Sequence, residues 1–204
     1  MVIEHQDDGW EDVAVTFAAV RTDTGRDVIQ RWANTLPSGG AVLDVGCGSG
    51  FPVSSTLADA GLTVFGIDAS PTLVSMFVQR FDSAHAACET VQDSPFFSRT
   101  FDGILAIGLL FLLSEEDQVK LIDKAGNALK PGGRFLFTAP HQKCEWKDVL
   151  TGQRSVSLGT TDYERLLARA GMQLIGTCMD EGENHYFAAV RCSDCTEVPA
   201  TVLI

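Results

Sequence analysis

Residues 42–50, Val-Leu-Asp-Val-Gly-Cys-Gly-Ser-Gly, limit the possible folds of this chain more than any other stretch. The first four residues of this run predict a buried strand. Gly46, Gly48 and Gly50 then alternate with small residues, and glycine lets the backbone turn sharply and lets a ligand lie against main-chain atoms. A strand that leads through a glycine turn into a helix is typical of the first unit of a nucleotide-binding site. The alternative is a plain tight turn after a core strand.

The spacing of the glycines narrows the choice of ligand. A dinucleotide-binding fingerprint needs G-x-G-x-x-G, and the last of these positions, counted from Gly46, is Phe51. A phosphate-binding P-loop needs a lysine after its last glycine, and no lysine follows Gly50. The loop therefore indicates an adenosine-type ligand without a pyrophosphate, and Phe51 argues against an NAD-linked oxidoreductase.

Composition and charge limit the classes of protein to which this chain can belong. With 204 residues, 45% of them hydrophobic, we expect one globular domain over residues 1–204, in which residues 1–20 form an N-terminal extension. No apolar run reaches the roughly 18 residues of a membrane span, and the first residues lack a signal-peptide pattern, so we expect a cytoplasmic protein. The net charge of −12 argues against nucleic-acid and anionic-membrane partners.

The six cysteines include one C-x-x-C pair, Cys192 and Cys195, near the C-terminus. A structural zinc site would need two more ligands, and His141 and Cys144 are the only suitably spaced candidates. We therefore expect free thiols on a loose tail over residues 193–204, and no metal ion.

Strands and helices alternate along most of the chain, which predicts an α/β fold with a mostly parallel sheet covered on both faces. The expected strands are 41–45, 62–67, 85–88, 101–107, 134–138, 173–179 and 185–191. The expected helices are 11–20, 24–36, 53–60, 71–81, 115–129 and 162–170. A capping box from Thr161 to Glu164 marks the start of the last helix.

Two connections complete the expected topology. The turn over residues 180–184 is too short for a crossover, so the last two strands must be antiparallel neighbours. Residues 139–160 form a long segment without a regular pattern. Loops of this length in compact domains are commonly functional, so we expect a substrate lid there.

Three stretches resemble sequence motifs of the class I S-adenosylmethionine-dependent methyltransferases. The glycine loop at 42–50 is similar to motif I, Phe101-Asp-Gly-Ile-Leu-Ala to the strand-four motif, and Leu129-Lys-Pro-Gly-Gly-Arg-Phe-Leu-Phe to the strand-five entry. Asp68 adds the acidic residue that this family places at the end of strand two. The resemblance covers about residues 21–191. It implies a Rossmann-like three-layer sandwich with a seven-stranded, mostly parallel sheet in the order 3-2-1-4-5-7-6, in which strand 7 is antiparallel.

The resemblance also implies a cofactor and an activity. The chain would bind S-adenosylmethionine and transfer its methyl group to a small-molecule acceptor by in-line displacement, leaving S-adenosylhomocysteine. The alternative is a catalytically idle S-adenosylmethionine-binding or interaction protein on the same fold. The sequence contains neither the N-P-P-Y-type tetrapeptide of nucleobase N-methylation nor the Pro-Cys pair of cytosine C5-methylation. It does not show whether oxygen, nitrogen or sulfur is methylated.

Residues at the strand ends are the cofactor contacts that the resemblance implies. Asp68 would accept hydrogen bonds from the ribose hydroxyls. Arg21 would pair with the methionine carboxylate, with a plain surface arginine as an equal alternative. Glu89 and Asp93 compete for the place beside the adenine, and we favour Glu89. The full expected set is Arg21, Asp44, Gly46, Cys47, Gly48, Asp68, Ala69, Glu89, Thr90, Ile107 and Gly108.

Strand direction predicts where the acceptor binds. Ligands of open α/β sheets bind at the C-terminal ends of the parallel strands, and an antiparallel last strand starts on that same side. The expected acceptor contacts are His141, Trp146, Glu181, Asn184, His185 and Tyr186. His185 is the candidate base, with a plain hairpin histidine as the alternative. The acidic residues of the 180–184 turn and the negative net charge favour a neutral or cationic small acceptor.

Overall fold

The computed structural model describes residues 9–81 and 85–193. The expected loose tail, apart from its first residue, lies outside the described residues, as do Cys195 and the first eight residues of the N-terminal extension. Within the described ranges, no helix has the length and apolar character needed to cross a membrane.

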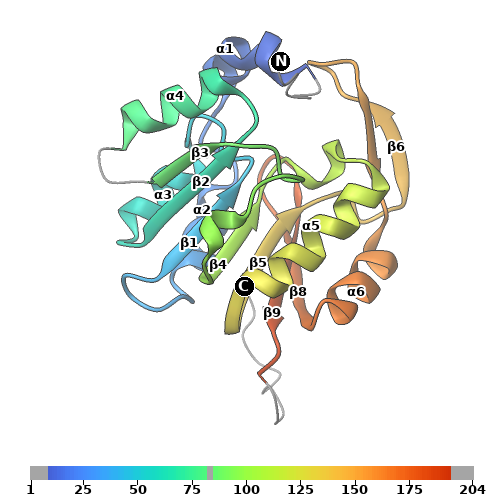
Figure 1. Ribbon diagram of the computed structural model, residues 1–204. Helices are drawn as coiled ribbons and strands as arrows, with labels where there is room; N and C mark the ends of the chain where they lie inside the picture. Colours follow the sequence, from blue (N-terminus) through green and yellow to red (C-terminus); the bar gives the residue numbers. More distant parts are fainter. Residues whose placement is uncertain (1–8, 82–84, 194–204) are drawn as a thin grey trace.

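The centre of the molecule is a seven-stranded sheet with strand order β3-β2-β1-β4-β5-β9-β8 (Figure 1). Its strands are β1 Ala41–Val45, β2 Thr63–Asp68, β3 His85–Cys88, β4 Phe101–Ala106, β5 Leu129–Thr138, β8 Met172–Met179 and β9 His185–Arg191. Strands β1 to β5 are parallel, and β9 runs antiparallel to both β5 and β8. The α/β class, the mostly parallel sheet and the antiparallel hairpin at its end are therefore confirmed.

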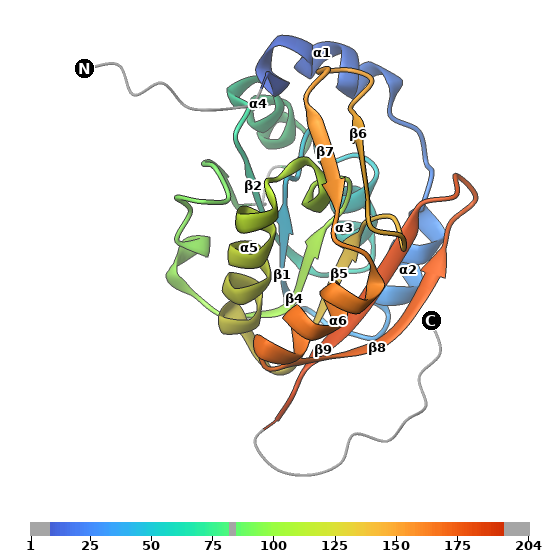
Figure 2. The ribbon, with the colours of Figure 1, turned by 90° about the vertical axis from the view of Figure 1, so that its right-hand side faces the viewer.

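Helices cover both faces of the sheet and make three layers (Figures 1 and 2). The helices are α1 Trp10–Val20, α2 Arg26–Ala33, α3 Val53–Asp59, α4 Pro71–Arg80, α5 Glu115–Ala128 and α6 Thr160–Arg169, with short 3₁₀ turns η1 Phe96–Ser98 and η2 Leu110–Leu112. Side chains of α5 and α6 join one core cluster, and those of α2, α3 and α4 join the other.

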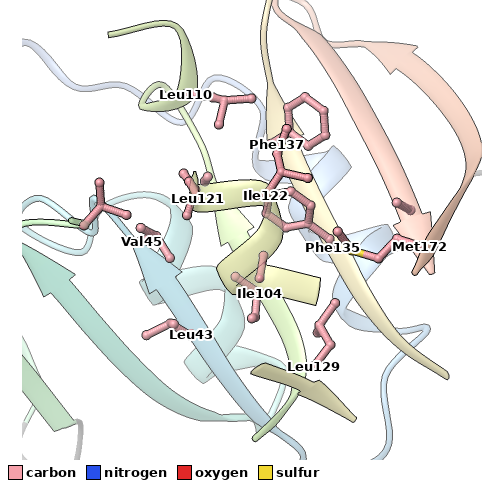
Figure 3. Close-up of a cluster of buried hydrophobic side chains, with 14 of the residues drawn as sticks. Leu43, Val45, Ile104, Leu110, Leu121, Ile122, Leu129, Phe135, Phe137 and Met172 are labelled. Atoms are coloured by element: carbon pink, nitrogen blue, oxygen red, sulfur yellow. The ribbon is translucent and has the colours of Figure 1, made fainter. Parts of the chain in front are cut away.

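The two clusters follow from the alternation of side chains along each strand. On β1, Leu43 and Val45 enter the cluster under α5, whereas Val42 enters the cluster on the opposite face. Figure 3 shows Leu43, Val45 and Ile104 from the sheet on the side that carries Leu121 and Ile122 of α5. Because β1 is buried on both faces, its sequence is a nearly continuous apolar run.

The segment 139–160 differs from the irregular lid that we expected. It contains a second, two-stranded antiparallel sheet, β6 Cys144–Lys147 with β7 Arg154–Ser157. Polar residues obscure these strands in the sequence, because β6 is mostly exposed and β7 buries two serines, Ser155 and Ser157, among its inward-facing residues. Because β6 and β7 are counted before them, the last two strands of the main sheet are β8 and β9. The order of the main sheet is therefore 3-2-1-4-5-9-8 instead of the expected 3-2-1-4-5-7-6.

Several element boundaries differ by a few residues from the sequence analysis, and the starts of α6 and β5 differ for clear reasons. Helix α6 starts at Thr160 after Gly159, and no side-chain hydrogen bond caps it, so the predicted capping box at Thr161 is wrong. Thr161 already lies inside the first turn, where its backbone is helical. Strand β5 starts at Leu129 instead of Arg134. Leu129 already pairs with Phe101 of β4, and a register shift separates this pair from the pair of Arg134 with Gly103.

Two elements lie beyond the C-terminal ends of the parallel strands. Helix α1 covers this end above α4, and the hairpin of β6 and β7, called here the arm (residues 144–157), rises toward the same end from the other side (Figures 1 and 2). They bound the part of the molecule where ligands of open α/β sheets bind.

Candidate functional site

A cleft opens at the C-terminal ends of β1, β2 and β4, with α1 on its outer side. Seven residues of the expected cofactor set line it: Arg21, Gly46, Asp68, Ala69, Glu89, Ile107 and Gly108. The other four expected residues, Asp44, Cys47, Gly48 and Thr90, are not among the lining residues. The structure thus brings together side chains and backbone from five separate parts of the chain.

The glycine loop is fixed by hydrogen bonds to the end of β2. The backbone N–H groups of Gly46 and Cys47 both donate to the carbonyl of Ile67, at 2.8 and 3.0 Å. Gly46 has a φ of 73° and Gly48 a φ of 54°, a conformation that other residues rarely adopt. Cys47 itself is buried beneath the loop, which raises the pKa of its thiol. The loop therefore presents backbone to the cleft.

Asp68 connects the tip of β2 with both neighbouring segments. Its Oδ2 accepts from the N–H of Gly48 at 2.8 Å, and its Oδ1 accepts from the N–H of Ser70 at 2.9 Å. Burial raises the pKa of Asp68, and the two backbone hydrogen bonds oppose this effect. A carboxylate oxygen can accept two hydrogen bonds, so each oxygen of Asp68 retains capacity for a hydroxyl donor.

Asp44 lies below the loop and outside the cleft. Its side chain is 2% exposed, and the hydroxyl of Ser54 donates to its Oδ2 at 2.6 Å. Burial raises the pKa of Asp44 to about 6, while the charge of Arg21 acts in the opposite direction. Its position makes Asp44 a supporting residue of the loop.

Helix α1 contributes one side of the cleft through Trp10 and Phe17, whose rings meet edge to face with centroids 5.3 Å apart. Arg21 follows directly after the helix and places its guanidinium 5.2 Å from the centroid of Phe17. Burial lowers the pKa of Arg21. Within residues 9–81 and 85–193, no hydrogen bond or ion pair engages this guanidinium, so its donors are available to a ligand in the cleft.

The acidic residues after β3 take different positions. Glu89 lines the cleft, whereas Asp93 is exposed and accepts a hydrogen bond from the hydroxyl of Thr90 at 2.8 Å. Thr90 in turn accepts from the N–H of Asp93 at 3.2 Å, so these two residues close a local turn. This arrangement favours Glu89 over Asp93 as the residue that contacts a ligand.

The end of β4 is open toward the cleft at Gly108. Its N–H donates to the hydroxyl of Thr138 on β5 at 2.7 Å, and its φ is 71°. A Cβ at this position would meet no protein atom within 4 Å, so the space beside Gly108 is accessible to a ligand.

The expected acceptor residues fall into two groups. His141 and His185 lie together just past the end of β5, with ring centroids 4.1 Å apart, and the N–H of Ala139 donates to the carbonyl of His185 at 3.1 Å. Burial, followed by the charge of His185, lowers the pKa of His141. The buried Nε2 of His141 has no hydrogen-bond partner among the residues that the structure describes.

Trp146 belongs to the arm and contacts Phe111 of η2, with ring centroids 5.4 Å apart. The base of the arm is fixed by Gln118 of α5, which is fully buried. The amide of Gln118 donates to the carbonyls of Leu113 and Val156, at 3.1 and 2.9 Å. Its oxygen accepts from the hydroxyl of Tyr163 at 2.8 Å. The arm is thus anchored beside η2, whose Leu112 lines the cleft.

The second group, Glu181, Asn184 and Tyr186, makes contacts within the protein. Glu181 accepts from the N–H of Gly25 at 3.0 Å, next to the start of α2. The amide of Asn184 and the hydroxyl of Tyr186 both donate to Asp180, each at 3.0 Å. Tyr186 is 1% exposed. The structure places these three side chains in a network that holds the β8–β9 turn against α2.

The sequence analysis missed much of the apolar lining of the cleft, which includes Trp10, Phe17, Leu73, Val91, Leu112 and Leu113. The signal that could have found part of this set is the composition of α1, in which only Glu11, Asp12 and Thr16 interrupt a run of apolar residues. No group of three or more metal-ligating side chains comes together in the described part of the chain.

Comparisons with known proteins agree with this geometry. A family model described as a methyltransferase domain matches residues 42–133. The cypemycin N-terminal methyltransferase of Streptomyces sp is 39% identical over 152 residues, which cover 71% of this chain and 61% of that protein. The tRNA U34 carboxymethyltransferase of Aeromonas hydrophila is 28% identical over 139 residues, covering 63% and 42%. The chain thus spans less than half the length of the latter relative.

A solved structure shows the same fold. Magnesium protoporphyrin IX methyltransferase from Synechocystis PCC 6803 with bound S-adenosylmethionine superposes with a TM-score of 0.65 at 20% identity, covering 94% of this chain and 85% of the other. The sheet order and the glycine-loop cleft define a Rossmann-like methyltransferase fold. Residues 42–133 thus match a methyltransferase domain, and the fold is the one that a solved S-adenosylmethionine-bound methyltransferase has.

Proposed function

We propose that this chain is an S-adenosylmethionine-dependent methyltransferase that acts on a small-molecule acceptor. One observation carries the proposal. Backbone of the glycine loop, the carboxylates of Asp68 and Glu89, the open position at Gly108 and the available guanidinium of Arg21 all face one cleft. Each of these groups matches one part of the cofactor of the family.

The residues present fit S-adenosylmethionine. Asp68 has an accepting position free on each oxygen for the two ribose hydroxyls, and Glu89 lies on the side of β3, where the adenine amino group belongs. Arg21 offers a guanidinium fork to the methionine carboxylate. Gly108, without a Cβ, leaves space for the methionine chain.

Bound S-adenosylmethionine supplies an electrophilic methyl group on a sulfonium centre, and the protein supplies position and a shielded environment. Trp10 and Phe17 cover the cleft and exclude water from it. The rings of His141 and His185 are in contact near the end of β5, and Gly108 follows the neighbouring strand β4. An imidazole in this position can accept the acceptor's proton. We assign His185 as the base and His141 and Trp146 as acceptor contacts.

The acceptor in this proposal is a small neutral or cationic molecule, and nucleic acid and membrane are not partners. The net charge of −12 disfavours binding of a polyphosphate chain. The proposed acceptor therefore differs from the tRNA named for two of the relatives. The name of the cypemycin N-terminal methyltransferase points to a terminal amine, which is a cationic acceptor of the proposed kind.

A labelling experiment tests the acceptor class. The protein is incubated with methyl-labelled S-adenosylmethionine and, separately, with a small-molecule extract and with total tRNA. We expect label only in the small-molecule fraction, and a His185→Ala variant should lose most of it. Label in tRNA would contradict the acceptor class, and cofactor binding without transfer to either fraction would favour the idle-protein alternative.

A further inference from the structure

Helix α1 lies over the cofactor cleft and packs against α4. Its inner side carries Trp10 and Phe17 into the cleft, and Ala14 is its fully buried residue. Most of its remaining side chains are partly or fully exposed. A ligand that fills the cleft therefore lies against Trp10 and Phe17 of this helix.

Glu11 fastens the start of α1 to the start of α4. Its Oε2 accepts from the hydroxyl of Ser70 and from the N–H of Thr72 at 3.3 Å, and its Oε1 accepts from the hydroxyl of Thr72 at 2.5 Å. These hydrogen bonds lower the pKa of Glu11, with Ser70 as the largest cause. The ionised carboxylate also lies at the N-terminal end of α4, where a helix favours negative charge.

The residue that binds Glu11 also binds the ribose carboxylate. Ser70 is fully buried, its hydroxyl donates to Glu11, and its N–H donates to Oδ1 of Asp68 at 2.9 Å. The same hydroxyl accepts from the N–H of Leu73 and caps α4. Ser70 therefore links the contact between α1 and α4 directly to Asp68, the carboxylate that would hold the cofactor.

We propose that α1 is a lid over the cofactor cleft and that Glu11 is its latch, a positioning residue that holds Trp10 and Phe17 closed over the bound cofactor. Ser70 links the latch to Asp68, so closure of the lid and occupation of the cleft stabilise each other. The inference rests on the proposed function, because S-adenosylhomocysteine is the ligand whose escape the latch slows. If Glu11 served only as an additional cap of α4, its loss would lower stability and leave ligand release unchanged.

The test measures the rate at which S-adenosylhomocysteine leaves the full chain, by stopped-flow tryptophan fluorescence. The variants are Glu11→Ala and Glu11→Gln, each with a matched control at the exposed neighbour, Asp12→Ala and Asp12→Asn. Glu11→Ala should release the ligand about tenfold faster, since it loses hydrogen bonds to a charged group, and Glu11→Gln should lie between it and the wild type. Both Asp12 variants should match the wild type.

A second pair of variants tests the other side of the latch. Thr72→Val removes one hydroxyl donor to Glu11 with little change of shape, and Ser75→Ala on the exposed side of α4 is its control. Release of S-adenosylhomocysteine should be faster in Thr72→Val than in the wild type, and Ser75→Ala should match the wild type. Hydrogen exchange of residues 10–20 in the ligand-bound protein should be faster in Glu11→Ala and Thr72→Val than in either control.

The outcomes separate the inference from the proposed function. If the wild type binds S-adenosylhomocysteine and neither the Glu11 variants nor Thr72→Val changes its release, the latch is wrong and the proposed function stands. If the wild type does not bind S-adenosylhomocysteine, the proposed function is wrong and the latch falls with it.

Discussion

Asp68 accepts a hydrogen bond from the backbone N–H of Gly48 at 2.8 Å, and this contact joins the tip of β2 to the loop that follows β1. The carboxylate thus has two tasks, since it shapes the loop and offers its remaining accepting positions to the cleft. A single substitution at Asp68 therefore affects both the loop and the ligand.

Replacement of Asp68 by alanine should weaken S-adenosylhomocysteine binding by about 1.5–3 kcal/mol, the range for hydrogen bonds to a charged group. Isothermal calorimetry measures the change. Asp93→Ala is the control, because Asp93 is exposed and contacts Thr90 instead of the cleft. Equal affinity for Asp68→Ala and the wild type would show that the ribose is held by other groups.

Alanine substitutions at two glycines separate the effect of backbone strain from the effect of ligand contact. Gly108 and Gly132 have φ values of 71° and 76°, and a Cβ on either would meet no protein atom within 4 Å. Alanine at each position should therefore cost a similar roughly 1–2 kcal/mol of stability. Only Gly108→Ala should also weaken S-adenosylhomocysteine, because only Gly108 lines the cleft. Equal ligand affinity in the two variants would place the methionine chain elsewhere.

Asp44 makes the stability depend on pH. Burial raises its pKa from 3.8 to about 6, so between these values the folded chain holds a proton that the unfolded chain has lost. Stability should fall as the pH rises from about 4 to about 6, by roughly 2–3 kcal/mol, and then level off. Asp44→Asn does not titrate and can still accept from Ser54, so its stability relative to the wild type should increase over this window.

Urea unfolding at pH 4.5 and pH 7.5 measures this difference. Asp12→Asn, at an exposed position, is the control and should track the wild type at both pH values. A constant difference between Asp44→Asn and the wild type would mean that Asp44 is ionised throughout.

The arm depends on Gln118. In Gln118→Leu, the carbonyls of Leu113 and Val156 lose their donor inside the protein, and buried unpaired groups cost about 1–3 kcal/mol each. The variant should lose roughly 2–4 kcal/mol of stability, and amide exchange should accelerate in residues 144–157. Gln153→Leu, exposed at the end of the arm, should change neither quantity. Unchanged exchange in Gln118→Leu would show that the arm is held by other contacts.

The sequence predicted the fold where local signals and long-range packing agree. Strand β1 is buried on both faces, so its sequence is an apolar run. Glycines with positive φ follow this run and form a sharp turn, and the two signals together located the strand in the sequence. The helices expected at 71–81 and 115–129 are confirmed as α4 and α5, because each has a local start signal: Ser70 caps α4 and Ser114 caps α5. The family resemblance implied an acidic residue at the end of strand two, and Asp68 lies there and lines the cleft.

The sequence could not show which polar residues serve the structure and which face the ligand. Glu181 and Tyr186 lie at the expected end of the sheet, but their contacts with Gly25 and Asp180 depend on how α2 packs. Glu11 gave no signal, because its partners Ser70 and Thr72 are about sixty residues away in the sequence. The arm remained hidden because each of its strands has only four residues, and β6 is mostly exposed while two of the three buried residues of β7 are serines.

Calorimetric titration of the wild-type chain with S-adenosylhomocysteine, and separately with NAD, tests the central claim most directly. The cleft, with Gly46, Asp68 and Glu89 at its strand ends and Phe51 in place of the third dinucleotide glycine, predicts one S-adenosylhomocysteine bound per chain and no heat from NAD. Binding of NAD without any response to S-adenosylhomocysteine would contradict the assignment.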